Sequence, residues 1–216
     1  MFNHRFPARF LGVAAIASLG IAAAASASVT NAAYAGANGL EGLGSFSAQI
    51  TYSYTSGSTA GITIVLTNTT GAATGGYITA MALNCASGVD SLSFASSSSG
   101  AFGGLAGPVS TSPFGNFDVG ASTSSSWLGG GSPNSGIAVG QSVTFGFTAT
   151  GSASSLAAQN ASSIFVLPDG LGMAVRFRGM ANGGSDKVLG EVVAPGPGAL
   201  ASMALLCTGR SRRRRA

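Results

Sequence analysis

Three carboxylates are the residues whose type and position could carry chemistry in this chain. Asp118, Asp169 and Asp186 are the acidic residues that lie near glycine-rich turns. Two facing carboxylates can serve as the acid and base of a glycosidase, and grouped carboxylate oxygens can hold calcium. However, the chain has no Asp-x-Asp-x-Asp spacing. Asp169 also suits the turn 168–170, and Asp186 could pair with Lys187 or an arginine. A polysaccharide hydrolase that works with carboxylates alone is therefore only a weak candidate for the function of this chain.

Aromatic residues suggest a second kind of chemistry, the binding of sugar rings. Trp127 is flanked by serines and glycines, so we expect it in an exposed loop. The face of an indole can stack on a sugar, and Tyr52 and Tyr54 could extend such a surface. This makes a carbohydrate-binding module the main alternative function. The preferred interpretation of Trp127 is that it covers the rim of the core.

Histidine and cysteine usage argues against the common catalytic and metal sites. The one histidine, His4, lies in a segment that we expect to be removed. Without an imidazole the chain cannot build a Ser-His-Asp or Cys-His proton relay, nor a zinc site that uses histidine. Two cysteines, Cys85 and Cys207, are too few for a cysteine-rich zinc site, and Cys85 suits a small buried position. We expect a non-catalytic protein without a metal or cofactor.

The beginning of the chain has the layout of a secretory signal peptide. Arg5 and Arg9 give a positively charged start, and residues 10–25 form an uninterrupted run of small and apolar side chains. This order of charge and apolar run is typical of a segment that directs export and is then removed. We expect this segment to be a helix during export.

Two positions in this region suit the enzyme that removes signal peptides. Ala25 and Ala27 form a small-x-small site, and residues 33–35 form a second one. The sequence therefore predicts that the mature chain begins at Ser28 or at Gly36.

The end of the chain has the layout of a C-terminal sorting signal. A proline-glycine break precedes a short apolar run, residues 199–207, and a cluster of arginines. The ten residues 198–207 would rise about 15 Å as a helix, whereas the hydrocarbon core is about 30 Å thick. Arginines cross a membrane at high cost, so the run would contact the membrane only transiently while an enzyme cuts the chain. The residues expected to direct this processing are Pro195, Gly196, Pro197, Arg212, Arg213, Arg214 and Arg215.

This layout behind a signal peptide is similar to that of the PEP-CTERM proteins of bacteria. In that family the break reads Val-Pro-Glu-Pro, and here Val193-Ala194-Pro195-Gly196-Pro197 stands in its place. Weaker similarity to the same family occurs at 135–145 and 183–188. The resemblance implies secretion or display at the cell surface, with the export machinery and an exosortase-like enzyme as partners. It also implies a role in the extracellular or biofilm matrix, where polysaccharide is a possible partner.

Most of the positive charge of the chain lies near its ends. The whole chain carries +4, but seven of its ten basic residues lie within residues 1–9 or 210–216, and all six acidic residues lie between these two segments. The mature domain is therefore near −3, which does not favour nucleic acid binding. We expect a signal peptide at 1–27 (or to 35), one domain at 36–190, and a sorting signal at 191–216.

Alternation with a period of two dominates that domain and predicts strands that bury one face. A hairpin is expected from 45–54 and 62–67, and a central strand, apolar on both faces, at 77–84. A second hairpin is expected from 163–167 and 173–178, around the turn at 168–170. Further strands are predicted at 89–94 and 141–150, residues 96–140 are expected to form long loops with one or two edge strands, and 154–162 a short helical turn.

This pattern predicts an all-β fold, an antiparallel sandwich of the immunoglobulin-like or jelly-roll kind. The terminal signal and sorting segments are expected to be helices that flank it. The residues predicted to share the core are Phe46, Ile50, Ile64, Leu66, Leu83, Phe145 and Phe147.

Overall fold

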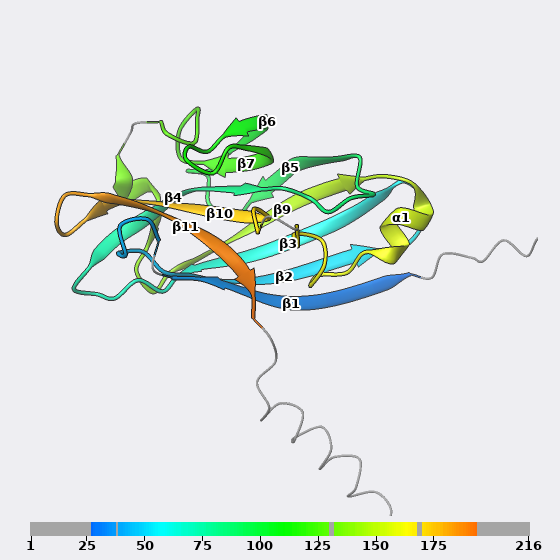
Figure 1. Cartoon of the computed structure of the whole chain (residues 1–216), viewed down its shortest axis with the longest axis horizontal. Helices are drawn as coiled ribbons and strands as arrows, with labels where there is room; N and C mark the ends of the chain where they lie inside the picture. Colours follow the sequence, from blue (N-terminus) through cyan, green and yellow to red (C-terminus); the bar gives the residue numbers. More distant parts are fainter. Residues whose placement is uncertain (1–26, 38, 130–131, 168–169, 194–216) are drawn as a thin grey trace, which may run out of the picture.

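The computed structural model describes residues 27–37, 39–129, 132–167 and 170–193, and these form an all-β domain (Figure 1). The predicted terminal helices lie outside the described residues. The elements are β1 (Ser28–Gly36), β2 (Phe46–Tyr54), β3 (Thr59–Asn68), β4 (Gly75–Leu83), β5 (Ser91–Ser97), β6 (Gly103–Ser110), β7 (Asn116–Ser122), the 3-10 turn η1 (Pro133–Ser135), β8 (Ile137–Ala138), β9 (Ser142–Thr150), α1 (Ala153–Ala158), β10 (Met173–Met180) and β11 (Ser185–Val192).

All the strand pairs of the described residues are antiparallel. The strands follow the order β5-β9-β3-β2-β1-β11-β10-β4-β7-β6, and β8 pairs with β4. The two ends of this order, β5 and β6, contact each other, so the sheet is nearly closed. Its first and last strands in the chain, β1 and β11, are neighbours.

The alternation that predicts the first hairpin is confirmed. Side chains of β2 alternate between buried and at least partly solvent-exposed, and β2 pairs with β3 over eight positions. The central strand is also confirmed, because β4 pairs with β10 on one side and with β7 and β8 on the other. All seven predicted core residues are buried in one cluster. A smaller cluster on the other face of β4 includes Ala80, Ala82 and Trp127.

The strand predicted at 173–178 is confirmed as β10, but the strand predicted at 163–167, and with it the hairpin around 168–170, is wrong. Residues 161–165 form turns, and β10 pairs instead with β4 and β11. The amide oxygen of Asn160 accepts the N–H groups of Ser162 and Ser163 at 2.9 and 3.1 Å. Such local side-chain bonds favour a turn over an extended strand. The short helical turn predicted nearby is present as α1.

Two regions contain more sheet than the sequence predicts. Residues 96–140, expected to be mainly loop, hold β6, β7 and β8. Residues 28–35, which we associate with export, form most of β1, and all nine positions of β1 pair with β2. At the other end β11 continues to Val192. Among the described residues, no helix is long and apolar enough to cross a membrane.

Candidate functional site

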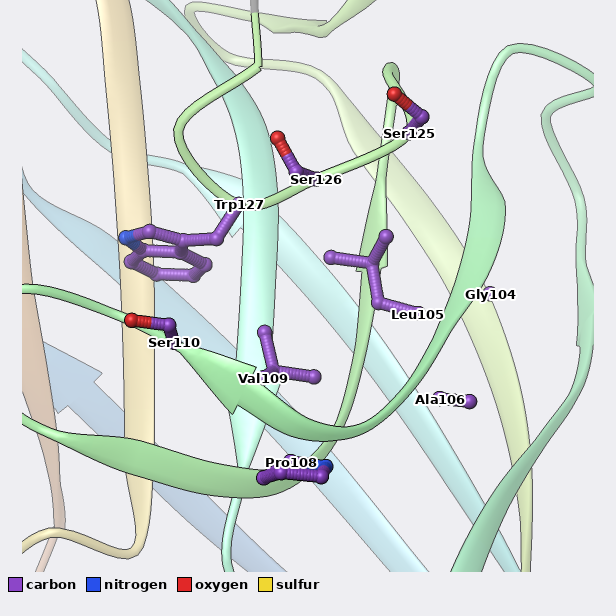
Figure 2. Close-up of a pocket in the computed structure, with 9 residues that line it drawn as sticks. All are labelled: Gly104, Leu105, Ala106, Pro108, Val109, Ser110, Ser125, Ser126 and Trp127. Atoms are coloured by element: carbon purple, nitrogen blue, oxygen red, sulfur yellow. The ribbon is translucent and has the colours of Figure 1, made fainter.

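A hollow of about 260 Å³ lies between β6 and the loop that carries Trp127. Figure 2 shows the loop passing over the strand, with Leu105 and Val109 between them. Serine hydroxyls and small side chains make up much of the wall, so the hollow offers hydrogen bonds but no charge. Its lining consists of Gly104, Leu105, Ala106, Pro108, Val109, Ser110, Ser125, Ser126 and Trp127.

The prediction that Trp127 lies in an exposed loop is wrong. Only 1% of its surface is exposed, because the ring lies in the smaller core cluster together with Phe117 and the alanines of β4. The indole Nε1 has no hydrogen-bond partner among the described residues. Figure 2 shows this nitrogen at the end of the ring away from Leu105 and Val109. A buried face cannot stack on a sugar. Trp127 belongs to the core itself, whereas its preferred interpretation places it on the rim that covers the core.

The two tyrosines proposed to extend a sugar-binding surface are buried as well. The hydroxyl of Tyr52 donates to the carbonyl of Leu156 at 2.6 Å, and that of Tyr54 donates to the carbonyl of Gly57 at 3.1 Å. Both rings belong to the main core. Burial raises the pKa of Tyr52, with the neighbouring Tyr54 as a further cause. The three aromatic side chains therefore do not form an exposed sugar platform.

Two arginines of β10 fix the loop that follows Trp127. The Nη1 of Arg176 donates to the carbonyls of Trp127 and Gly129 at 2.8 and 3.3 Å, and the Nη1 of Arg178 donates to Gly129 at 3.3 Å. The strand lies inside the sheet, so the arginines do not occupy an edge. Burial, and then the charge of Arg178, lowers the pKa of Arg176. These contacts give the arginines a positioning role.

Asp118 and Cys85 meet at a second hollow, of about 360 Å³. The Oδ2 of Asp118 accepts the backbone N–H of Cys85 at 2.9 Å and its thiol at 3.2 Å. Burial, the hydrogen bond to Asp118 and the charge of Asp118 raise the pKa of Cys85 to about 12. A thiol with this pKa is protonated near neutral pH and is a poor nucleophile. Within the described ranges, no three histidine, cysteine or acidic side chains are grouped to hold a metal.

Asp186 is 1% exposed and is surrounded by backbone donors. Its carboxylate accepts the N–H groups of Glu41, Leu43 and Gly44 at 2.8–2.9 Å, and that of Lys187 at 2.7 Å. The expected pairing of Asp186 with the Lys187 ammonium or an arginine is therefore wrong. Backbone N–H groups of the loop 41–44 donate hydrogen bonds to the Asp186 carboxylate instead. Asp169, the third candidate carboxylate, lies outside the described residues.

The predicted processing positions border the sheet. Ala27 is exposed and directly precedes β1. The second predicted cleavage site lies within β1, where Tyr34 is buried and its hydroxyl donates to the carbonyl of Ser162 at 3.2 Å. Burial raises the pKa of Tyr34 to about 12. At the other end, the N–H of Val193 donates to the carbonyl of Ala33 as the last bond of the ladder.

The remaining predicted positions cannot be placed: Ala25, Pro195, Gly196, Pro197, Arg212, Arg213, Arg214 and Arg215 lie outside the described residues. Comparison of the chain with protein-family models, curated proteins and solved structures gave no match. The contacts around Asp118 and Asp186 were not predicted, because they join residues that are 33 and about 140 positions apart.

Proposed function

We propose that this chain is a non-catalytic protein of the bacterial exterior, exported by its N-terminal segment and processed at its C-terminal tail. The observation that carries the proposal is the fit between the sheet and the two predicted processing sites. The sheet begins at Ser28, directly after the small-x-small site of Ala25 and Ala27, and ends at Val192, just before the proline-glycine break. Cutting at both places would leave every described strand intact.

This fit also favours one of the two signal cleavage sites. A cut after Ala35 would remove eight of the nine residues of β1, including the buried Tyr34. A cut after Ala27 removes none of them. We therefore propose Ser28 as the first residue of the mature protein and extend the proposed domain to 28–193.

The register of β1 and β11 supports a processing segment that stays out of the sheet. Tyr34 is opposite Val192, so the same register would bring Pro195 opposite Asn31 and Pro197 opposite Val29. These are positions where a ladder needs an N–H donor, and proline has none. The break would remain available to a processing enzyme of the exosortase kind.

The described surface suits a structural role in an extracellular matrix. The chain is 7% charged, so its exterior is built largely from serine, threonine and glycine. The carboxylates of Asp118 and Asp186 are engaged by the fold, which gives no support to the hydrolase alternative. The antiparallel order and the shared core support a sandwich of two packed sheets as the finer description of the fold. The immunoglobulin-like and jelly-roll topologies both remain proposals.

The tail arginines provide the experiment that tests processing. Replacing Arg212, Arg213, Arg214 and Arg215 with serine should let the tail follow the domain out of the cell, because the charge that opposes translocation is lost. Most of the exported variant should then retain Cys207 in its intact mass. The matched control replaces the same four residues with lysine, which keeps the charge and should leave processing unchanged. Normal removal of the tail from the serine variant would contradict the proposal.

A further inference from the structure

The edge of β1 is covered over only part of its length. β1 pairs with β2 at all nine positions, but its other side pairs with β11 only at Tyr34 and Ala35, with one further bond to Ala33. In Figure 1, β1 lies along the lower margin of the sheet, and β11 crosses to it at one place. Among the described residues, nothing pairs with the open side of residues 28–32. The unpaired side of residues 28–32 is called the open edge.

The backbone groups that point out of the open edge can be assigned. The carbonyl of Ala33 accepts a bond from Val193, so it points toward β11. In an antiparallel strand, the N–H and C=O of one residue point to the same side, and successive residues alternate. Val29 and Asn31 therefore direct their donors and acceptors to the open side, whereas Thr30 and Ala32 direct theirs to β2.

In the register of β1 and β11, the sequence that follows Val193 would be a poor partner for the open edge. In the register of β1 and β11, the residues that would face Asn31 and Val29 are Pro195 and Pro197. Neither has an N–H to donate, so both carbonyls of β1 would lack a partner. We therefore expect the partner of the open edge to be another extended segment.

The open edge lacks the features that commonly prevent strands from joining. Its residues, 28–32, include no charged side chain, no proline and no bulge, and Val29 is 67% exposed. The strands at the two ends of the sheet order do have such features. β5 is bulged next to Phe94, and β6 is bulged at a segment that contains Pro108. Natural sheets use bulges and prolines to discourage edge pairing. The open edge of β1 lacks the features that β5 and β6 have, which indicates that this edge is suited to pairing with another strand.

Exposed apolar side chains continue from the open edge. Val193 lies at the end of β11, and Val166 and Val192 line a hollow of about 240 Å³ beside Tyr34 and Phe165. Four of the six large hydrophobic residues exposed in the described part of the chain are thus at this margin. An apolar patch that adjoins unpaired backbone is typical of an interaction surface.

We propose that the open edge pairs with the same edge of a second copy of this chain. The edge is self-complementary: with Thr30 on a two-fold axis, Val29 of each copy is opposite Asn31 of the other. Both are residues whose N–H and C=O face outward, so each such pair exchanges two backbone bonds. The threonines on the axis form a favourable cross-strand pair. The result is a closed dimer with antiparallel β1 strands, in which Val166, Val192 and Val193 lose exposure.

Proline substitution separates the two sides of β1. Val29→Pro removes a donor only from the open edge, so the variant should be monomeric, and at a concentration where the natural chain is also monomeric the two should unfold at the same temperature. The matched control Ala32→Pro removes the donor opposite Ile50 of β2 and should lower the unfolding temperature. Asn31→Pro tests the same edge if Val29→Pro does not fold.

The measurement is the molar mass of the exported chain in solution, from light scattering or sedimentation. The natural chain should be dimeric at about 100 µM, since small interfaces are typical of weak association that needs a high concentration. A natural chain that is monomeric at this concentration would overturn the proposal. A dimer that survives Val29→Pro and Asn31→Pro would also overturn it, as would a monomer whose β1 pairs only with an extended segment of another exported protein. Failure here leaves the processing proposal untouched, because that depends on the mass of each chain and not on its association.

Discussion

Replacement of Asp186 by asparagine is expected to lower the free energy of unfolding by about 2 to 4 kcal/mol, because hydrogen bonds to a buried charge are strong and costly to leave unmade. The carboxylate accepts three N–H groups from residues 41–44 and one from Lys187. An asparagine would keep one acceptor oxygen and turn an NH₂ group toward donors. Chemical denaturation at pH 7 measures the loss. The control is Asp90→Asn, whose side chain is exposed and should change stability little.

The same carboxylate should make stability depend on pH. Burial alone raises the pKa of Asp186, but the backbone donors of Gly44, Glu41, Leu43 and Lys187 outweigh it and lower the pKa. A lowered pKa in the folded state stabilises the fold at pH values above the ordinary aspartate pKa of about 4. This stabilisation is lost as the pH falls through the folded pKa. The natural chain should therefore lose stability below about pH 4 more steeply than the asparagine variant. Equal slopes for the two proteins would show that Asp186 is not held in this way.

Replacement of Trp127 by alanine should destabilise the fold by about 3 to 5 kcal/mol, as is typical of large aromatic side chains in a core. Trp127 fills the smaller core cluster between β4, β6 and β7. The adjacent Leu128 is 49% exposed, so Leu128→Ala provides a matched control that should change the free energy of unfolding by less than about 0.5 kcal/mol.

The Trp127 variant also separates core packing from sugar binding. If Trp127 were an exposed platform, its replacement would abolish binding on a glycan array and leave the unfolding transition in place. The buried position predicts the opposite, a large shift of the transition. An unfolding free energy equal to that of the natural chain would contradict this position of Trp127.

The alternation of side chains made much of the sheet predictable. Strands such as β2 and β9 carry apolar residues at every second position, and that pattern depends only on the local geometry of a strand. The strand β1 was missed because its alanines and polar residues carry little hydrophobic contrast and follow an export-like segment. The turns at 161–165 were mistaken for a strand because the side chain of Asn160, and not the apolar pattern, determines the local conformation.

The arrangement of the functional candidates was less predictable, because it depends on contacts between distant segments. Glycines and serines around Trp127 indicate a loop but do not reveal that two arginines of β10 hold this loop against the core. The sequence gives Asp186 a charged neighbour, Lys187, but the fold brings the loop 41–44 to it. The terminal segments are different, since their signals depend on order and composition along the chain.

The most direct test of the proposed function is the intact mass of the natural chain after export, combined with sequencing of its first residues. Processing at both ends predicts a protein that begins at Ser28, ends close to the break at 195–197, and lacks Cys207 and the arginine cluster. Every strand from β1 to β11 would then be retained. Recovery of a secreted chain that begins at Met1, or that still carries the arginine cluster, would contradict the account of this protein as an exported domain with removable ends.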